Sequence, residues 1–432
     1  MRQEAYFCTV KELDKLGKNN IPQQLISHTH LIYSSPATLA FNSPGAEGFG
    51  VKRAGLAVPD SIMLIVSPGC CGRNTSVLSS MRAYHDRFYY LLMDETDIVT
   101  GRHLKKIPKA VAEICEGLEK KPSVVMICIT CVDALLGTDM ERVCHKAEES
   151  VGIPVRPCYM YALTREGRKP PMVHVRQSIY SLLEPKKKKG NVVNLLGYFS
   201  PLIDDCELYE LLHGAGVKTI HEISRCRDYA EYQTMAEANF NLVLHPEARF
   251  AAEDFHDRLK IPYIELRRLY QTDKIASQYQ AFGAALGVEF DDEAPRKAAE
   301  DAIIKFRDLY PDASFAVGEW MNADPFELAL ALVRYGFRVP EIYGTLSGEN
   351  FVYVKQLAKI SPETKVFSNL EPTMLYYDGS KSDIDLTIGK DAGYYHKECP
   401  NVRWNEEQQP FGYAGVRRLF EALAEVSYNE RT

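Results

Sequence analysis

Short apolar segments alternate with amphipathic segments along almost the whole chain. Each apolar run ends in an elbow that contains Gly, Pro, Ser or Asn, and a stretch with helical periodicity follows it. The runs are continuous and rich in β-branched residues, which is typical of strands that helices cover on both faces. This alternation predicts an α/β protein with mainly parallel sheets. The predicted strands are Ser61–Ser67, Ser123–Thr130, Asn191–Gly197, Phe240–Leu244, Ser314–Gly318, Lys365–Ser368 and Ile384–Ile388.

Length and charge limit the class of protein. At roughly 150 residues per domain, 432 residues allow two to four domains, and 46% apolar residues can fill their cores. The formal net charge of −7 gives no general attraction for a nucleic acid or an anionic membrane surface. The N-terminus lacks the pattern of a signal peptide, and no uncharged apolar run is long enough to span a membrane. We therefore expect a cytoplasmic protein with neither nucleic acid nor membrane as its partner.

Two breaks in the pattern divide the chain. The segment Glu184–Gly190 (EPKKKKG) separates a helix from a new strand, and its charge run is interpreted as a solvated hinge. A second break near Tyr310–Asp312 follows a long polar helix predicted over Asp292–Leu309. Three Rossmann-like domains with mainly parallel sheets flanked by helices are predicted, over residues 1–189, 190–310 and 311–432.

Cysteines follow two of the predicted strands directly. Cys70 and Cys71 come after Ser61–Ser67, and Cys131 comes between a strand and a helix predicted over Val132–Ser150. Ligands of parallel sheets bind at the carboxyl ends of the strands, where a helix N-terminus also lowers the pKa of a thiol. Such thiolates suit iron or zinc, although buried packing cysteines are the alternative. The odd count of eleven cysteines argues against a disulfide framework in a reducing compartment.

The number of usable thiolates predicts a shared site. Cys128 and Cys131 form a CxxC, but their odd offset on a strand sends the two side chains to opposite faces. The same geometry lets one of Cys70 and Cys71 point into a site, which leaves about two good thiolates per chain. A cubane iron-sulfur cluster takes four protein thiolates. Two chains must therefore contribute if these cysteines hold such a cluster.

Motifs of other enzyme classes are missing. Gly45–Arg53 lacks the Gly-Lys-Ser/Thr ending of a P-loop, no strand precedes a GxGxxG, and no GxSxG elbow occurs. Neither ATP hydrolysis nor dinucleotide binding is therefore expected. A second set of polar residues follows strands later in the chain, and these residues would line a cleft if the second and third domains face each other. They are His245, Trp320, Met321, Asn322, Glu371, Lys390 and Asp391.

Several motifs in order resemble one family. They are PGCCGRN, MDETDIVTG at Met93–Gly101, CVDALLGTDM at Cys131–Met140, the segment Asn241–Leu266, DLTIGKD, and the PFGYAG turn at Pro410–Gly415. In this order the chain resembles the nitrogenase component 1 superfamily over nearly its whole length. That superfamily contains nitrogenase molybdenum-iron protein subunits, cofactor-assembly scaffolds, and nitrogenase-like reductases of tetrapyrroles and organosulfur compounds.

The resemblance implies a metal site and partners. Cys71 and Cys131 match two cluster-ligating cysteines of the family, and Cys70 is a packing residue or an alternative ligand. A 4Fe-4S cluster held by two cysteines from each of two chains is consistent with this, in a homodimer or a heterodimer with a homologous chain. The family also implies electrons from a separate ATP-dependent iron-sulfur reductase, and thus the cytoplasm of an anaerobe.

Departures from the family restrict the function. No cysteine lies between Cys8 and Cys70, so the eight-iron cluster of nitrogenase is not expected. His245 stands where the catalytic nitrogenase subunit has a cofactor-binding cysteine, and the family's cofactor histidine is missing near residues 403–405. Dinitrogen reduction is therefore not supported. His245 becomes a candidate proton donor or axial ligand, and Glu371 a candidate acid.

Three functions remain open from the sequence. In the first, the chain is the catalytic component of a nitrogenase-like reductase, which passes low-potential electrons through a 4Fe-4S cluster to a substrate in an interdomain cleft. That substrate is a tetrapyrrole or a small unsaturated or sulfur compound. In the second, the chain is a non-catalytic scaffold for metal-cofactor assembly. In the third, the chain has lost the cluster and binds a small molecule.

Overall fold

The described strands form three sheets, and the chain divides into two compact units. Unit 1 contains Met1–Pro44, Ser200–Gly216 and Arg267–Thr432, and unit 2 contains Gly45–Phe199 and Val217–Leu266. The computed structural model describes residues 4–26, 35–41, 47–69, 84–160 and 169–429.

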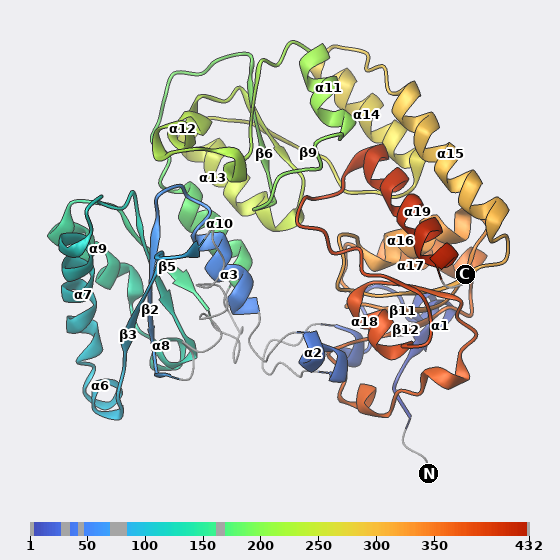
Figure 1. Ribbon diagram of the computed structural model, residues 1–432, viewed down its shortest axis with the longest axis horizontal. Helices are drawn as coiled ribbons and strands as arrows, with labels where there is room; N and C mark the ends of the chain where they lie inside the picture. The colour runs from blue at the N-terminus through green and yellow to red at the C-terminus, as the bar shows by residue number, and fades with distance from the viewer. Residues whose placement is uncertain (1–3, 27–34, 42–46, 70–83, 161–168, 430–432) are drawn as a thin grey trace. The chain divides into compact units, whose positions relative to one another are not determined.

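The first sheet of unit 2 is parallel throughout its described strands. Its order is β3-β2-β4-β5. Helices α7 and α9 pack on one face of this sheet, and α3 and α10 pack on the other (Figure 1). Continuous apolar strands with helices on both faces are what the sequence predicts. The bounds are β2 Ile62–Ser67, β3 Phe88–Leu92, β4 Val125–Ile129, β5 Val155–Tyr159, α3 Glu47–Gly55, α7 His103–Gly117, α9 Met140–Val151 and α10 Pro171–Tyr180.

The second sheet of unit 2 is also parallel, with the order β7-β6-β8-β9. Helices α12 and α13 join one apolar core with this sheet, and α10 packs against α13. The two sheets of unit 2 therefore share a core cluster through α10. The bounds are β6 Val192–Leu196, β7 Thr219–His221, β8 Phe240–Val243, β9 Tyr263–Glu265, α12 Tyr229–Thr234 and α13 Arg249–Leu259.

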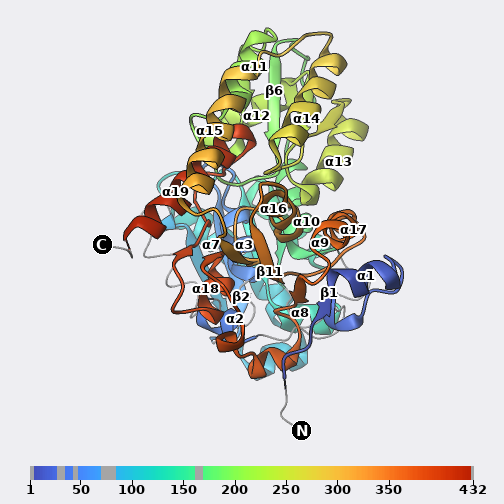
Figure 2. The ribbon, with the colours of Figure 1, turned by 90° about the vertical axis from the view of Figure 1, so that its right-hand side faces the viewer.

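Unit 1 contains a sheet with the order β1-β12-β11-β10-β13-β14. All its described pairings are parallel except that of β1, which runs antiparallel to β12. Helix α16 packs on β11, and α17 lies between α16 and α1 (Figure 2). The bounds are β1 Cys8–Thr9, β10 Ser314–Val317, β11 Arg338–Tyr343, β12 Lys365–Phe367, β13 Leu386–Ile388, β14 Asn401–Val402, α1 Val10–Leu16, α16 Pro325–Arg334, α17 Phe351–Ile360 and α18 Lys390–Tyr395.

A buried carboxylate joins the helices of unit 1. Glu207 of α11 (Glu207–Gly214) accepts hydrogen bonds from the backbone N–H groups of Tyr413 and Ala414, at 2.7 and 3.1 Å. These groups lie in the first turn of α19 (Gly412–Asn429) and have no partner within a helix. A Cβ atom on Gly412 would lie 1.9 Å from Glu207 Oε1, so this approach requires glycine. Helix α19 also packs on α14 (Thr272–Leu286) and α15 (Glu293–Leu309).

All seven predicted strands are confirmed, together with the long helix that α15 forms. Strands β5 and β11 were missed because each contains a proline, Pro157 or Pro340, which demotes a strand pattern. In β11 the proline lies where the register with β10 shifts. Strands β7 and β9 were also missed, because three residues are too few to show an apolar pattern, and β3 was missed because it is half exposed.

Two expectations about helices were wrong. The helix predicted over Val132–Ser150 is two helices, because Gly137 adopts a positive φ of 65° and ends α8 (Cys131–Leu136) before α9 begins. The PFGYAG segment is no simple turn, since α19 begins inside it at Gly412.

The division into three domains stays a prediction. Glu184–Gly190 has no regular secondary structure and lies within unit 2, where Lys188 Nζ donates to the Ala236 carbonyl at 2.9 Å. The predicted break at Tyr310–Asp312 lies within unit 1, between α15 and β10. Among the helices in the described part of the chain, none is long and apolar enough to cross a membrane.

Candidate functional site

Cys131 lies at the carboxyl end of a central strand of unit 2. It is the first residue of α8, directly after β4 and Thr130, and its side chain is partly exposed. The Sγ atom is 4.0 Å from the carbonyl oxygen of Met160, beyond the end of the neighbouring strand β5. The position is thus the strand end that the sequence predicts for this cysteine.

Cys70 and Cys71 fall outside the described residues. Their strand, β2, neighbours β4 in parallel register, with Val66 opposite Ile129. The last described residue before them is Gly69. The prediction that Cys71 shares a site with Cys131 therefore rests on the alignment of the two strand ends.

A buried histidine and carboxylate anchor the helix that Cys131 begins. His103 Nε2 lies 2.9 Å from Asp133 Oδ1, and both side chains are almost completely buried. Thr138 Oγ1 donates to the same carboxylate oxygen at 3.0 Å, while His103 Nδ1 is 3.1 Å from the Asp97 carbonyl oxygen. His103, which follows the MDETDIVTG motif, thus bridges the backbone of that motif and the Asp133 side chain of CVDALLGTDM.

The MDETDIVTG motif forms a capped helix beside this pair. Asp94 accepts from the Asp97 N–H at 2.7 Å, and the Asp97 side chain reaches back to the Asp94 N–H, so the two residues form a capping box for α6 (Glu95–Thr100). Lys106 Nζ donates to Asp97 Oδ2 at 2.6 Å and lowers the pKa of this carboxyl. These contacts give the acidic motif a structural role close to Cys131.

Three buried oxygens around this strand edge have no hydrogen-bond partner among the described residues. They are Ser67 Oγ at the end of β2, Thr130 Oγ1 at the end of β4, and Asp133 Oδ2 in α8. Ser67 and Thr130 each follow one of the paired residues Val66 and Ile129. A buried polar atom without a partner calls for an explanation such as a bound group or water. The three oxygens and the Cys131 thiol make this edge a candidate binding site.

His245 lies at a strand end of the second sheet in unit 2, after β8. Its ring is 38% exposed and packs edge-to-face on Tyr198, with centroids 5.7 Å apart. The N–H of Glu247 donates to His245 Nδ1 at 3.3 Å. This bond assigns the proton of the neutral imidazole to Nε2. In its neutral form His245 can thus donate a hydrogen bond through Nε2.

Arg176 of α10 supports the same strand ends from the core. It is 4% exposed, donates to the Gly197 carbonyl at 2.6 Å, and forms an ion pair of 2.7 Å with Glu247. Its guanidinium also lies 4.7 Å from the ring centre of Phe199. Gly197 has a φ of 137°, and a Cβ atom there would lie 2.7 Å from the backbone nitrogen of His245. Arg176 therefore fixes the elbow that carries His245.

A buried carboxylate occupies the strand ends of unit 1. Asp391, the second residue of α18, accepts hydrogen bonds from the N–H groups of Glu319 and Trp320, at 2.9 and 3.2 Å, and from the Asn369 side chain at 2.7 Å. Burial raises the pKa of Asp391. Burial also raises the pKa of Glu319, and the nearby charge of Asp391 adds to that rise. Asn369 and Glu319 are the residues missed from the sequence at this edge.

Glu371 has a different environment. It accepts from the Thr373 N–H at 3.4 Å and from the Thr373 hydroxyl at 3.2 Å, at the start of a short helix over Pro372–Tyr376. Glu371 takes no part in the hydrogen bonds that Asp391 accepts from Glu319, Trp320 and Asn369. Glu371 lies in unit 1 and His245 in unit 2, so their common role stays a prediction.

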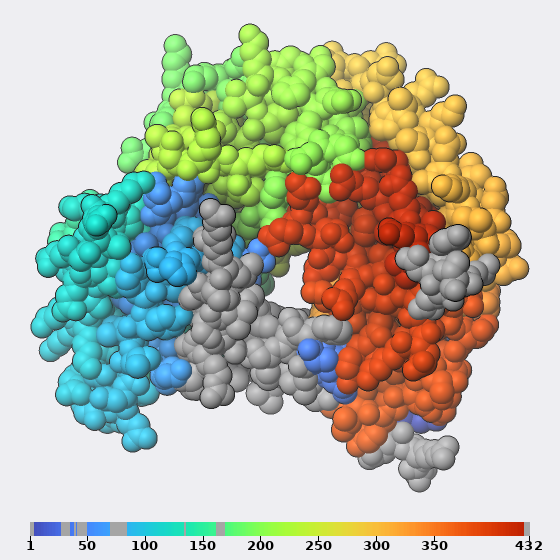
Figure 3. Space-filling model, viewed as in Figure 1, coloured from blue at the N-terminus to red at the C-terminus, as the bar shows by residue number. Residues whose placement is uncertain are grey.

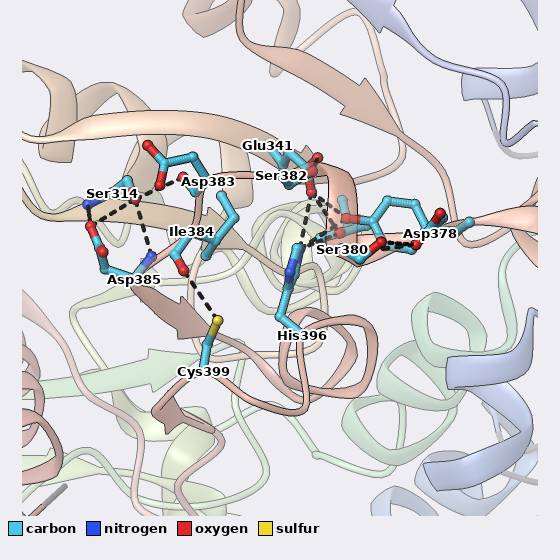
Figure 4. A network of polar contacts seen from close by, with 12 residues as sticks. Ser314, Glu341, Asp378, Ser380, Ser382, Asp383, Ile384, Asp385, His396 and Cys399 are labelled. Carbon is cyan, nitrogen blue, oxygen red and sulfur yellow. Dashed lines mark hydrogen bonds and ion pairs between the residues drawn. The ribbon is translucent and has the colours of Figure 1, made fainter.

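A second buried cluster of unit 1 surrounds Glu341 of β11. Ser382 donates to Glu341, and His396 Nε2 lies 3.1 Å from Glu341 Oε2 (Figure 4). The hydroxyl groups of Tyr343 and Tyr377 donate to the same oxygen at 2.9 and 2.6 Å. Burial alone would raise the pKa of Glu341, but the hydrogen bonds from the imidazole and the three hydroxyl groups outweigh it and lower the pKa. No sequence motif indicates this cluster.

The described strands and helices define an α/β protein of mainly parallel sheets, with a partly exposed cysteine at one strand end. The profile of the family described as nitrogenase component 1 type oxidoreductase matches residues 47–427. The chain belongs to this family.

Individual relatives agree with this assignment. The chain is 24% identical over 420 residues to the nitrogenase iron-molybdenum cofactor biosynthesis protein NifE of Sinorhizobium fredii, which covers 92% of this chain and 84% of the relative. It is 20% identical over 351 residues to the nitrogenase molybdenum-iron protein alpha chain of Methanococcus maripaludis, with 78% and 73% covered. The solved structure of nitrogenase Cp1 at pH 6.5 shares the fold, with a TM-score of 0.71, 17% identity and 96% of each chain covered.

Proposed function

We propose that the protein is the cluster-bearing chain of a nitrogenase-like reductase. The observation that carries this proposal is the edge formed by β2 and β4, where a partly exposed thiol, Cys131, lies beside buried oxygens that have no partner among the described residues. Membership of an oxidoreductase family supports a redox role for this edge.

The ligand set we propose is Cys71 and Cys131 from each of two chains, with Cys70 as the alternative to Cys71. Among the described residues, no three His, Cys, Asp or Glu side chains gather in a way that could hold a metal ion. Cys131 therefore needs thiolates from elsewhere, and four thiolates are the usual set for a 4Fe-4S cluster. When bound, the cluster would supply single low-potential electrons.

Exposed apolar side chains of unit 2 support a two-chain site. Leu135 and Leu136 of α8 are 66% and 50% exposed, Leu92 of β3 is 60% exposed, and Val99 of α6 is 85% exposed. Figure 3 shows α6 and the neighbouring α7, coloured cyan to turquoise, on the surface of unit 2. Exposed apolar side chains that form one contiguous patch mark protein interfaces. We propose that a second copy, or a homologous chain, covers them.

The electron donor we propose is a separate ATP-dependent iron-sulfur reductase in the same cytoplasm. The chain itself lacks a P-loop, so energy from ATP must enter through a partner. The proposed substrate is a tetrapyrrole or a small unsaturated or sulfur compound.

Protons would come from His245, and Glu371 is a second candidate acid. The hydrogen bond from Glu247 to Nδ1 leaves the His245 proton on Nε2, on a ring that is 38% exposed. Arg176 and Glu247 hold the elbow in place. When protonated, an imidazole at this elbow would act as a general acid near pH 7.

Anaerobic purification tests the proposal. The expected result is a brown protein with ~4 iron and ~4 sulfide per dimer, together with substrate consumption that requires both ATP and the reductase. Cys131→Ala should lose the iron, whereas Cys144→Ala, a buried thiol of α9, should keep it. A colourless wild-type protein without iron would overturn the proposal. The remaining function would then be that of a small-molecule binding protein without a cluster.

A scaffold for metal-cofactor assembly is the second candidate. The observation that favours it is the similarity to NifE of Sinorhizobium fredii, which is named a nitrogenase iron-molybdenum cofactor biosynthesis protein. A scaffold would bind iron as well, but it would consume no substrate with the reductase and would release its cluster to a second apo-protein. Transfer of radioactive iron to such an acceptor, without turnover, would select the scaffold.

A further inference from the structure

Two cysteines face each other on adjacent strands of the first sheet in unit 2. Cys128 of β4 and Cys158 of β5 are partners in the parallel register, and both are completely buried. Adjacent strands lie about 4.8 Å apart, which falls in the range of Cα separations that a disulfide spans. Directly paired residues also send their side chains to the same face. The backbone therefore places the two thiols where a bond between them can form.

The side chains interact with each other. A hydrogen bond from Cys158 lowers the pKa of the Cys128 thiol, and the charge of Lys52 lowers it further. The same hydrogen bond and burial raise the pKa of Cys158. Lys52 of α3 is only 2% exposed, and Cys158 Sγ is 3.5 Å from the neighbouring carbonyl oxygen of Val51. The shared hydrogen bond thus shifts the pKa values of the two thiols in opposite directions.

The pairing of Cys128 with Cys158 differs from the CxxC pairing of Cys128 with Cys131. Cys131 belongs to the helix α8, whereas Cys128 packs in the core formed with α3 and α10. The partner of Cys128 lies thirty residues further along the chain. The CxxC spacing gives no indication of it.

We propose that Cys128 and Cys158 are a redox modification site, a dithiol that a peroxide converts to a disulfide. The Cys128 thiolate attacks one oxygen of the peroxide, breaks the O–O bond and becomes a sulfenic acid, while the other oxygen leaves as water after taking up a proton. Cys158 then attacks the sulfenic sulfur, loses its proton, and expels a second water. Two thiols and one hydrogen peroxide thus give one disulfide and two waters, and the two electrons lost by sulfur reduce the peroxide.

The site does not depend on the proposed cluster. The disulfide would cross-link β4 to β5 three residues before Cys131, in the sheet that carries the proposed ligands. A reductant of the dithiol class would restore both thiols.

Peptide mass spectrometry tests the proposal on the full chain. Folded protein is treated with hydrogen peroxide, unfolded, alkylated and digested, and we expect a peptide linked through Cys128 and Cys158 that disappears after dithiothreitol. Cys128 and Cys131 share one tryptic peptide, so the Cys131→Ala variant assigns the link and also shows it without the proposed cluster ligand.

Two variants serve as controls. Cys158→Ser should lose the link and leave Cys128 to oxidise beyond the sulfenic acid, since no thiol remains to trap it. Cys144→Ser removes a buried thiol that pairs with neither residue, and it should keep the link at wild-type yield. Circular dichroism on each variant checks that the fold is retained. A folded, peroxide-treated wild type without the Cys128–Cys158 link, whether the thiols stay free or Cys128 pairs with Cys131, would overturn the proposal.

Discussion

His103 Nε2 lies 2.9 Å from Asp133 Oδ1, and this buried contact ties helix α7 to the helix that begins with Cys131. The residues are thirty positions apart in the chain, since Asp133 belongs to the CVDALLGTDM motif and His103 follows the MDETDIVTG motif by two residues. The second oxygen of Asp133 has no partner in the described part of the chain. Asp133 therefore combines a structural contact with an open acceptor next to the candidate thiol.

The His103→Ala variant should be strongly destabilised. Removing one partner of a buried pair leaves the other uncompensated and costs about 3–5 kcal/mol. Urea denaturation measures the change in the free energy of unfolding. His145→Ala is the matched control, because His145 forms an exposed pair with Glu149 on α9 and should cost less than about 1 kcal/mol. Equal effects of the two variants would contradict a structural role for the His103–Asp133 contact.

Cys131→Ala should remove the iron-sulfur absorbance and leave the fold intact. The lost thiol contributes about 1–3 kcal/mol of packing, which a protein of this size tolerates. Anaerobic absorption spectra and circular dichroism measure the two properties on one sample. Full iron content in this variant would refute Cys131 as a ligand.

His245→Ala should slow reductase-dependent turnover by about 10²- to 10⁴-fold, the range of general acid catalysis, with unchanged iron content. Turnover at saturating reductase, compared with iron quantitation, separates proton delivery from cluster loss. His256→Ala is the control, since His256 is an exposed histidine of α13. Wild-type turnover in His245→Ala would exclude His245 as the donor.

Glu327 should make the stability of the protein depend on pH. Its carboxylate accepts from the Tyr270 N–H and the Gln271 side chain, both at 2.9 Å, and burial raises its pKa from 4.5 to about 7. Because the folded state holds this proton more tightly, the contribution is complete below pH 4.5 and is lost as the pH rises through 7. The loss amounts to about 3 kcal/mol.

Urea unfolding at several pH values between 4.5 and 8 measures this slope. Glu327→Gln cannot ionise and should flatten it, while Glu363→Gln, at an exposed position, should leave it unchanged. An unchanged slope in Glu327→Gln would assign the pH dependence to other groups.

Gly318→Ala should destabilise unit 1. A Cβ atom at Gly318 would lie 2.1 Å from Asp391 Oδ1, so either the carboxylate or the end of β10 must move. Overpacking of this kind costs about 1–3 kcal/mol. Thermal denaturation compares it with Gly348→Ala, where no heavy atom lies within 4 Å of the new methyl group. Equal melting temperatures of the two variants would contradict the prediction, because they would mean that Asp391 moves away from the new methyl group without loss of stability.

The sequence by itself determined the strands with continuous apolar, β-branched residues, because their pattern depends on burial alone. It also determined that Cys131 follows such a strand, and that helices alternate with strands in parallel sheets. These features are local, and neighbouring residues in the chain carry the whole signal. Strands β5 and β11 were not predicted, because a proline interrupts the apolar pattern of each.

The tertiary structure alone decided which side chains meet. Asp133 contacts His103, Asp391 accepts a hydrogen bond from Asn369, and Cys128 pairs with Cys158. These contacts form because the fold brings distant segments of the chain together. A one-residue change of register would turn each strand residue to the opposite face. The spacing along the chain contains no information about these contacts, so only the folded sheet sets them.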